Sequence, residues 1–289
     1  MHLGNVLAAL LSWLSAKQQG GLWRLRIEDL DPQRSRREYA EQLMRDLEWL
    51  GLTWDGEVVW QSERTAIYEH YLNKLANIRE IRGIRTESLI YPCTCTRNEI
   101  LAAQAPHESD GRIVYPGTCR NKNIQSSKAA LRLIVPDEQI EYTDRVYGLQ
   151  SVNLATHCGD FIVRRSDGVF AYQLAVVVDD AEMGVTEIVR GRDLLLSAAQ
   201  QLYLYRLLGF PEPQFSHHPL LVNEAGQRLC KRDHALALSE MRRHMTAPEI
   251  IGLIAHKIGL TPTREALTPA QLIPLFNWSK IPLQDVISN

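Results

Sequence analysis

The sequence predicts an α/β fold with a parallel sheet, an inserted turn-rich subdomain and a helical tail. Helical and strand patterns alternate over residues 1–90, as they do in βαβ units. Residues 91–168 are rich in turn formers and hold three clustered cysteines, whereas residues 169–240 return to long apolar runs. Residues 241–289 have helical spacing broken by prolines. We therefore expect a sheet that is interrupted by an insertion and followed by helices.

The first part of the chain supplies three helices and two strands. Apolar residues recur at helical spacing from Leu3 to Leu14, and a Gly-Gly pair ends that helix. The segment WRLRIED alternates as a strand does, and residues 35–50 repeat the helical pattern. EVVWQ is a short second strand, and a further helix is expected from about Glu63 to Asn77.

Later segments complete the expected sheet. ALRLIV is a strand candidate, and the whole stretch from DFIVRR to VTEIVRG is β-prone, with an Asp-Gly turn inside it. DLLLSAAQQLYLYRLLG is expected to form a helix. HHPLLVNEAGQRLCKRDHAL then supplies a strand, a turn and a basic loop.

Composition places the chain among ordinary globular proteins. Of 289 residues, 45% are hydrophobic and 23% charged, and the net charge of −2 excludes a uniformly basic nucleic-acid coat. No apolar run approaches the ~18 residues of a membrane span. Five cysteines, an odd number, favour a reducing compartment, and we expect the cytoplasm.

The stretch MHLGN is typical of a phosphate-binding turn. His2, Gly4 and Asn5 come directly before an apolar helix, where backbone N–H groups and the helix dipole attract anions. Such a turn usually follows a strand, but only Met1 precedes this one. We therefore expect the first strand of the sheet to be missing.

Three cysteines have the spacing of a structural zinc site. Cys93 and Cys95 form one turn-rich knuckle and Cys119 a second, with Tyr115 four residues earlier. A tetrahedral site needs a fourth ligand, and the nearest histidine is His107. The alternative is that these cysteines are simply small buried apolar residues. The other two cysteines stand apart and are expected to bind no metal: Cys158 and Cys230.

Several motifs together resemble one enzyme family. HLGN is similar to the first signature of class I aminoacyl-tRNA synthetases, and RLCKRD is similar to their second. LRIEDLDPQR resembles a strand end of glutamyl-tRNA synthetases. QSER, YPCTCTR, VYPGTCR, AYQLAVVVDD and IVRGRDLL narrow the resemblance to the glutamyl-queuosine tRNA(Asp) synthetases, paralogues without an anticodon-binding domain. The resemblance covers essentially the whole chain.

The resemblance implies a reaction. L-glutamate reacts with ATP, which is accompanied by Mg²⁺, to give glutamyl-adenylate and pyrophosphate without tRNA. The glutamyl group then passes to the queuosine of tRNA(Asp). The implied enzyme is a cytoplasmic, monomeric ligase with no membrane association. Its implied domains are a Rossmann-type catalytic domain in two parts (1–90 and 169–240), a zinc-binding, acceptor-type insertion (91–168) and a helical tail (241–289).

The resemblance also implies roles for individual residues. The catalytic pair is His2 and Lys231, and ATP is bound by these two with Gly4 and Asn5. L-glutamate is held by Glu28, Tyr172 and Arg190. Structural zinc is held by Cys93, Cys95, Tyr115 and Cys119.

Elementary chemistry fits these roles but leaves alternatives open. Glu28 can accept from an ammonium group, and Arg190 can bind a carboxylate through two N–H groups. Each can instead belong to an ordinary ion pair with no role in substrate binding. The partners would be Arg24 or Arg26 for Glu28, and Asp179, Asp180 or Asp193 for Arg190. Two further acids are expected to serve as turn and cap residues: Asp29 and Asp31.

Basic clusters are equally open to two interpretations. They can contact tRNA phosphates or lie on solvated surfaces, and Lys231 itself can belong to an ordinary basic surface turn. The clusters are Arg34, Arg36 and Arg37; Arg164 and Arg165; Arg228 to Arg232; and Arg242 and Arg243.

Three departures from the family pattern bear on activity. An R-F-A-P-S-P-T-G-type loop is absent, Val176 stands where an asparagine is usual, and Cys230 replaces the serine of the second signature. Two further functions therefore compete with the enzyme. One is a truncated, inactive paralogue that acts as a binding module, and the other is a fragment of an ordinary glutamyl-tRNA synthetase.

Overall fold

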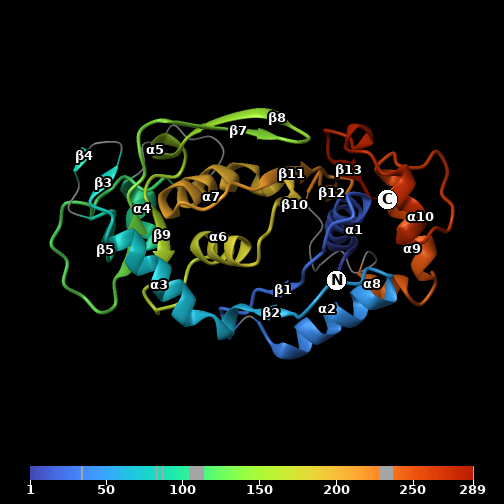
Figure 1. The fold of residues 1–289 in the computed structure, drawn as a ribbon, viewed down its shortest axis with the longest axis horizontal. Coiled ribbons are helices and arrows are strands. Elements are labelled where there is room, and N and C mark those ends of the chain that lie inside the picture. Colours follow the sequence, from blue (N-terminus) through green and yellow to red (C-terminus); the bar gives the residue numbers. More distant parts are fainter. Residues whose placement is uncertain (34, 82–83, 86–87, 104–113, 228–236, 289) are drawn as a thin grey trace.

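The computed structural model describes residues 1–289 except 34, 82–83, 86–87, 104–113, 228–236 and 289. The molecule is elongated, with the C-terminal helices at one end and the cysteine-bearing sheet at the other (Figure 1). The helices are α1 (Leu3–Gln18), α2 (Arg37–Trp49), α3 (Thr65–Ala76), α4 (Arg97–Ala103), α5 (Leu154–His157), α6 (Tyr172–Glu182), α7 (Leu195–Leu208), α8 (Leu238–Met241), α9 (Ala247–Lys257) and α10 (Pro269–Leu272).

The strands are short and form five separate sheets among the described residues. They are β1 (Arg26–Ile27), β2 (Val59–Trp60), β3 (Glu80–Ile81), β4 (Ile84–Arg85), β5 (Ile90–Cys93), β6 (Ala130–Leu133), β7 (Gln139–Asp144), β8 (Gly148–Asn153), β9 (Phe161–Arg164), β10 (Glu187–Gly191), β11 (Gln214–His218), β12 (Leu221–Val222) and β13 (Val286–Ile287).

The predicted parallel pairing is present in several places. Strand β1 pairs in parallel with β2, and β10 pairs in parallel with β11 over five residues. The second sheet continues in the order β10-β11-β7-β8, so the β7–β8 hairpin extends the parallel pair rather than standing apart from it. A separate antiparallel sheet, β5-β6-β9, carries Cys93 at the end of its first strand.

A cleft lies between the β1–β2 pair and the β10–β11 pair. Among the described strands, β1 bonds only to β2, and the free edge of β10 faces the same cleft of about 790 Å³. One wall carries Leu25 and Arg26, and the opposite wall carries residues 186–189. The floor is α1, which contributes four small side chains: Ala8, Ala9, Ser12 and Ala16. The cleft therefore lies beside the strand ends that carry the candidate site residues.

Helix α1 is the centre of one core and α6 is the centre of another. Leu3, Leu7, Leu10 and Leu14 of α1 are fully or almost fully buried against β10 and the C-terminal helices α9 and α10. The second core is formed by α3, α6 and α7, which contact one another. Burial on this scale, at about 25 cal/mol per Å² of apolar surface, is the main stabilising contribution.

The β-prone interpretation of the segment AYQLAVVVDD is wrong. Residues 172–182 form helix α6, and its consecutive residues Leu174 to Val178 are all buried. A helix enclosed on all sides carries no polar face, so its apolar run is indistinguishable from that of a buried strand. Packing against α3 and α7 overrides the β preference of three consecutive valines.

The tail also differs in one respect from the expected helices. Strand β13 pairs in parallel with β12 through Leu221↔Val286 and Val222↔Ile287, so the end of the described chain returns to the segment that follows β11. Two residues carry too little periodicity for the sequence to reveal this pairing. None of the helices in the described ranges combines the length and apolar character that a membrane crossing requires.

We predict that Gly252→Ala destabilises the protein, although alanine normally favours a helix interior by about 1 kcal/mol. A Cβ at this position of α9 would lie 1.6 Å from the backbone oxygen of Glu265. The segment is pinned there because Leu267 N–H donates to the Pro248 carbonyl at 2.9 Å. Urea unfolding should show a loss of about 2 kcal/mol or more.

The matched control is Gly209→Ala. Gly209 has φ 72° at the C-terminus of α7, and a Cβ there meets nothing within 4 Å. It should cost only the ~1 kcal/mol of a left-handed backbone. A stabilising effect of Gly252→Ala would contradict the packing of α9 on residues 265–267.

Candidate functional site

The N-terminus of α1 places His2 over Gly4. His2 is the N-cap residue with an extended backbone, and its N–H donates to Asn5 Oδ1 at 3.1 Å. A Cβ on Gly4 would lie 3.2 Å from the His2 imidazole, so a glycine leaves room for that ring. The N–H groups and dipole of the first turn make this end of α1 suited to an anion.

The segment after the basic loop returns to the same place. Lys231, Arg228 and Cys230 lie outside the described residues. The described chain resumes at Ala237, which forms an antiparallel bridge with His2, and Leu238 N–H donates to the Met1 carbonyl at 2.9 Å. The described residues that follow the basic loop therefore lie beside the first signature segment.

Glu28 lies immediately beyond β1 beside a half-buried arginine. Arg26 Nη2 contacts Glu28 Oε1 at 3.2 Å, so the ion-pair alternative for Glu28 is present in the structure. Arg26 also binds Asp180 at 2.5 Å and lies 3.8 Å from Asp179. Three carboxylates thus share this guanidinium, and Glu28 remains 43% exposed at the side chain. The surplus of negative charge suits an incoming ammonium group.

Arg190 lies on β10 and Tyr172 begins α6. No carboxylate is among the hydrogen-bond partners of Arg190 in the described chain, so its ion-pair alternatives are not present there. Desolvation of the hydroxyl raises the pKa of Tyr172. The charge of Arg190 lowers this pKa, and the charge of Glu28 raises it. Glu28 and Arg190 therefore both act electrostatically on the Tyr172 hydroxyl.

Asp180 lines the cleft and has an unusual environment. It is 7% exposed, and burial raises the pKa of its carboxyl, while the ion pair with Arg26 acts to lower it. Asp179 beside it is fully buried and accepts from Gln61 Nε2, Arg64 Nε and the Tyr68 hydroxyl at 2.6–2.8 Å. These hydrogen bonds connect the QSER segment to α6.

Sequence reasoning assigned no role to several residues around the site. From the sequence, Asp179 and Asp180 are expected only as ion-pair partners of Arg190, and the buried residues that hold Arg190 have no predicted role. The available signal was an acidic pair ending an apolar helix and a His-His pair ending a strand. The residues concerned are Asp144, Asp179, Asp180, Gln201 and His217. Val176 is 3% exposed within the second core.

The three clustered cysteines meet at a single point. The Sγ atoms of Cys93, Cys95 and Cys119 all lie within 4.8 Å of one another. The Tyr115 hydroxyl lies 3.3 Å from Cys93 Sγ and 3.9 Å from Cys95 Sγ. Three thiols and one phenol oxygen around one point are a donor set that fits a metal such as zinc. His107 lies outside the described residues, and Cys158 is not part of the cluster.

Neighbouring residues hold Tyr115 in place. The guanidinium of buried Arg132 stacks 3.6 Å above its ring, and Cys119 N–H donates to its hydroxyl at 2.9 Å. Its backbone bridges Gly159, where φ is 64° and a Cβ would lie 2.0 Å from the Tyr115 carbonyl oxygen. Only glycine fits at that contact.

Five arginines of the basic clusters have described ion pairs with acidic neighbours. Arg165 pairs with Asp31 and Asp167, and Arg242 pairs with Asp46. The same holds for the other arginines whose ion pairs are described: Arg37, Arg164 and Arg243. The expected turn role of Asp31 is confirmed, since it accepts from Gln33 N–H, whereas Asp29 accepts from the N–H and Oγ of the distant Ser62. Arg34 lies outside the described residues.

We predict that Gly159→Ala empties the cysteine cluster of metal. The added methyl group must displace the Tyr115 backbone, which separates the hydroxyl and thiols. Metal analysis after dialysis should fall from about one zinc per chain to below about 0.2, since a disrupted structural site binds weakly.

Gly148→Ala is the control for backbone strain alone. Gly148 has φ 67°, and a Cβ there meets nothing within 4 Å. This variant should keep its zinc. Full zinc occupancy in Gly159→Ala would contradict the described contact.

Comparison with known proteins identifies the family. Residues 1–281 match the model described as tRNA synthetases class I (E and Q), catalytic domain. The Glutamyl-Q tRNA(Asp) synthetase of Symbiobacterium thermophilum is 44% identical over 306 residues, covering 99% of this chain and 91% of that protein. The one from Nitratidesulfovibrio vulgaris is 42% identical over 307 residues, covering 100% and 92%.

A solved structure agrees with this assignment. The glutamate-tRNA synthetase of Elizabethkingia anophelis superposes with a TM-score of 0.81 at 26% identity, covering 100% of this chain and 66% of that chain. The α/β fold with its cysteine cluster is therefore that of a class I synthetase catalytic domain. The chain belongs to the class I (E and Q) tRNA synthetase family, on the branch of the glutamyl-Q tRNA(Asp) synthetases.

Proposed function

We propose that this protein is an ATP-dependent ligase that activates L-glutamate as glutamyl-adenylate without tRNA and transfers it to queuosine of tRNA(Asp). The observation that carries the proposal is near-full-length identity of 42–44% to proteins named for that activity. The charge distribution around Arg26, Glu28 and Arg190 supports it independently, because it is complementary to an amino acid with an ammonium group and carboxylates.

Glutamate binding is assigned to opposite ends of one polar region. Glu28 and Asp180 carry the negative charge that accepts the substrate ammonium, and Arg190 supplies N–H groups for a carboxylate. Tyr172 adds a hydroxyl on which the charges of Arg190 and Glu28 both act. Binding at fixed groups aligns the α-carboxylate for attack on the α-phosphorus of ATP, so positioning supplies much of the rate enhancement.

ATP is assigned to the N-terminus of α1. His2 donates to phosphate oxygens, Gly4 leaves space for the ring of His2, and Asn5 orients the turn through its bond to the His2 backbone. Lys231 follows the negative charge that develops on the departing pyrophosphate. The bridge between His2 and Ala237 supports this role, because it holds the residue that follows the basic loop beside His2.

The metal is assigned a structural role. Cys93, Cys95, Cys119 and Tyr115 would hold Zn²⁺, whose chemistry there is to crosslink two turn-rich segments. The protein must remain in a reducing compartment for these thiolates to persist, which supports a cytoplasmic location. We further propose that residues 91–168 form the insertion, residues 241–289 form the tail, and the enzyme acts as a monomer.

The test is glutamate-dependent ATP–pyrophosphate exchange without tRNA, followed by transfer of labelled glutamate to purified tRNAs. Exchange above the glutamate-free background is expected, with label transferred to queuosine-containing tRNA(Asp) and not to the same tRNA lacking queuosine. No exchange would favour an inactive binding module. Transfer to tRNA(Glu) would favour a fragment of an ordinary glutamyl-tRNA synthetase.

We predict that Arg190→Lys lowers kcat/KM for glutamate about 10- to 100-fold, as expected for losing a directed hydrogen bond to a charged group. Arg206→Lys is the matched control. Arg206 lies near the end of α7, and its ion pair is with Glu212, which is not a candidate site residue. The control should retain normal exchange. Equal kinetics for Arg190→Lys and the wild type would exclude Arg190 from glutamate binding.

A further inference from the structure

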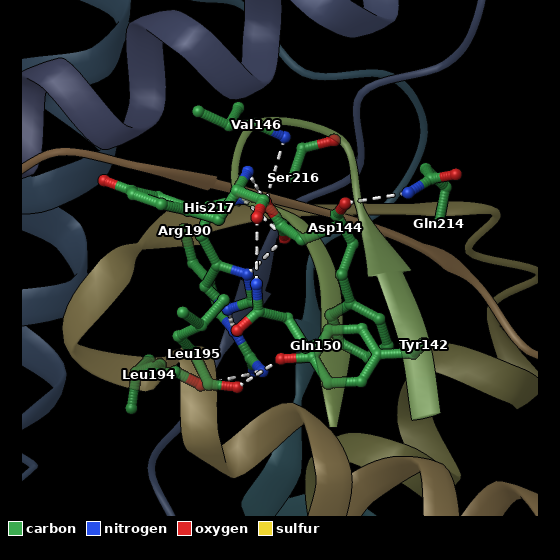
Figure 2. Close-up of polar contacts among 12 residues, drawn as sticks. Tyr142, Asp144, Val146, Gln150, Arg190, Leu194, Leu195, Gln214, Ser216 and His217 are labelled. Atoms are coloured by element: carbon green, nitrogen blue, oxygen red, sulfur yellow. Dashed lines mark hydrogen bonds and ion pairs between the residues drawn. The ribbon is translucent and has the colours of Figure 1, made fainter. Parts of the chain in front are cut away.

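We propose that His217 and Gln201 are positioning residues that orient the Arg190 guanidinium for the glutamate carboxylate. This inference rests on the proposed function, because it assumes that Arg190 contacts glutamate. Figure 2 shows His217 between Arg190 and Asp144, with Leu194 near the end of the guanidinium. The protein partners of Arg190 decide which of its N–H groups remain for the substrate.

Arg190 is held on three sides. Its Nε donates to His217 Nε2 at 3.0 Å, Nη1 donates to Gln201 Oε1 at 2.8 Å, and Nη2 donates to the Leu194 carbonyl at 3.4 Å. Its Cζ lies 5.2 Å from the ring centre of Phe215. A guanidinium has five N–H groups, so one on Nη1 and one on Nη2 have no described partner. These two can bind both oxygens of one carboxylate.

The His217 tautomer is set by Asp144. His217 Nδ1 contacts Asp144 Oδ2 at 2.6 Å, and both side chains are fully buried. Because the carboxylate accepts, Nδ1 carries the proton and Nε2 presents a lone pair to Arg190. Burial and the charge of Arg190 both lower the pKa of His217, which agrees with a neutral ring. Asp144 is itself held by the N–H groups of Val146, Tyr147 and His217.

Gln201 connects the arginine to the tyrosine side of the site. Gln201 is 1% exposed, and its Nε2 donates to Gln173 Oε1 at 2.9 Å. Gln173 follows Tyr172 at the start of α6. One amide therefore binds Arg190 through its oxygen and the first turn of α6 through its nitrogen. Loss of this amide releases Arg190 from the element that carries Tyr172.

Two substitutions of one histidine separate the proposed role from simple packing. Glutamine places its amide end where Nε2 stands and can still accept from Arg190, whereas asparagine reaches only the Nδ1 position, toward Asp144. His217→Asn should raise the KM for glutamate about tenfold, with the KM for ATP within twofold of wild type. His217→Gln should keep the KM for glutamate within about threefold. Exchange kinetics and glutamate titration calorimetry provide the two measurements.

A second position and a remote control complete the test. Gln201→Met removes the Nη1 acceptor at similar volume and should raise the KM for glutamate as His217→Asn does. His256→Asn, on exposed α9 surface, should change neither KM. Thermal unfolding of each variant separates folding defects from binding defects, and Gln201→Met decides the matter if His217→Asn does not fold.

The outcomes distinguish this inference from the proposed function. Wild-type exchange together with equal glutamate KM values for His217→Asn, His217→Gln and Gln201→Met would overturn the positioning role and leave the function standing. A parallel rise in both KM values with a lowered unfolding temperature would show a structural role only and would also overturn it. If wild-type protein neither exchanges nor binds glutamate, the function and this inference fall together.

Discussion

The buried Asp179 carboxylate is the interaction on which the site depends most. It is fully excluded from solvent, and a charge in that position is stable only when it is paired and hydrogen-bonded. Gln61, Arg64 and Tyr68 supply those bonds from the segment that follows β2. β1 and β10 are not bonded to each other, and Asp179 and Asp180 of α6 bind the segment after β2 and Arg26 of β1 respectively. Arg26, and through it Glu28, is placed by this arrangement.

The two candidate substrate groups are held in opposite ways. Glu28 belongs to an acidic cluster around one arginine and is open to solvent, so its charge is available at little desolvation cost. Arg190 is surrounded by neutral partners, His217 and Gln201, which use some of its donors without cancelling its charge. The site therefore has an acidic group and a basic group that form no described ion pair with each other. That separation is what a zwitterionic substrate requires.

The cysteine cluster depends on a different kind of constraint. Three thiols and a phenol converge because two turn-rich segments approach closely. The backbone of Tyr115 lies directly against residue 159, and this contact is possible only because residue 159 is a glycine. The stacking of Arg132 on the Tyr115 ring then fixes the hydroxyl. The site is therefore built from backbone geometry and one cation–π contact as much as from the ligands themselves.

The sequence by itself determined the α/β class, the helices α1, α2, α3 and α7, the three cysteines and the family, because periodicity and local motifs are written along the chain. It misassigned α6, since a fully enclosed helix has no polar face to reveal its period. Only the tertiary structure decided the different surroundings of Glu28 and Arg190. Asp180, which shares Arg26 with Glu28, is more than 100 residues away from it in the sequence. His217, which binds Arg190, is 27 residues away from it. Contacts between distant segments depend on packing, and packing leaves no local pattern in the sequence.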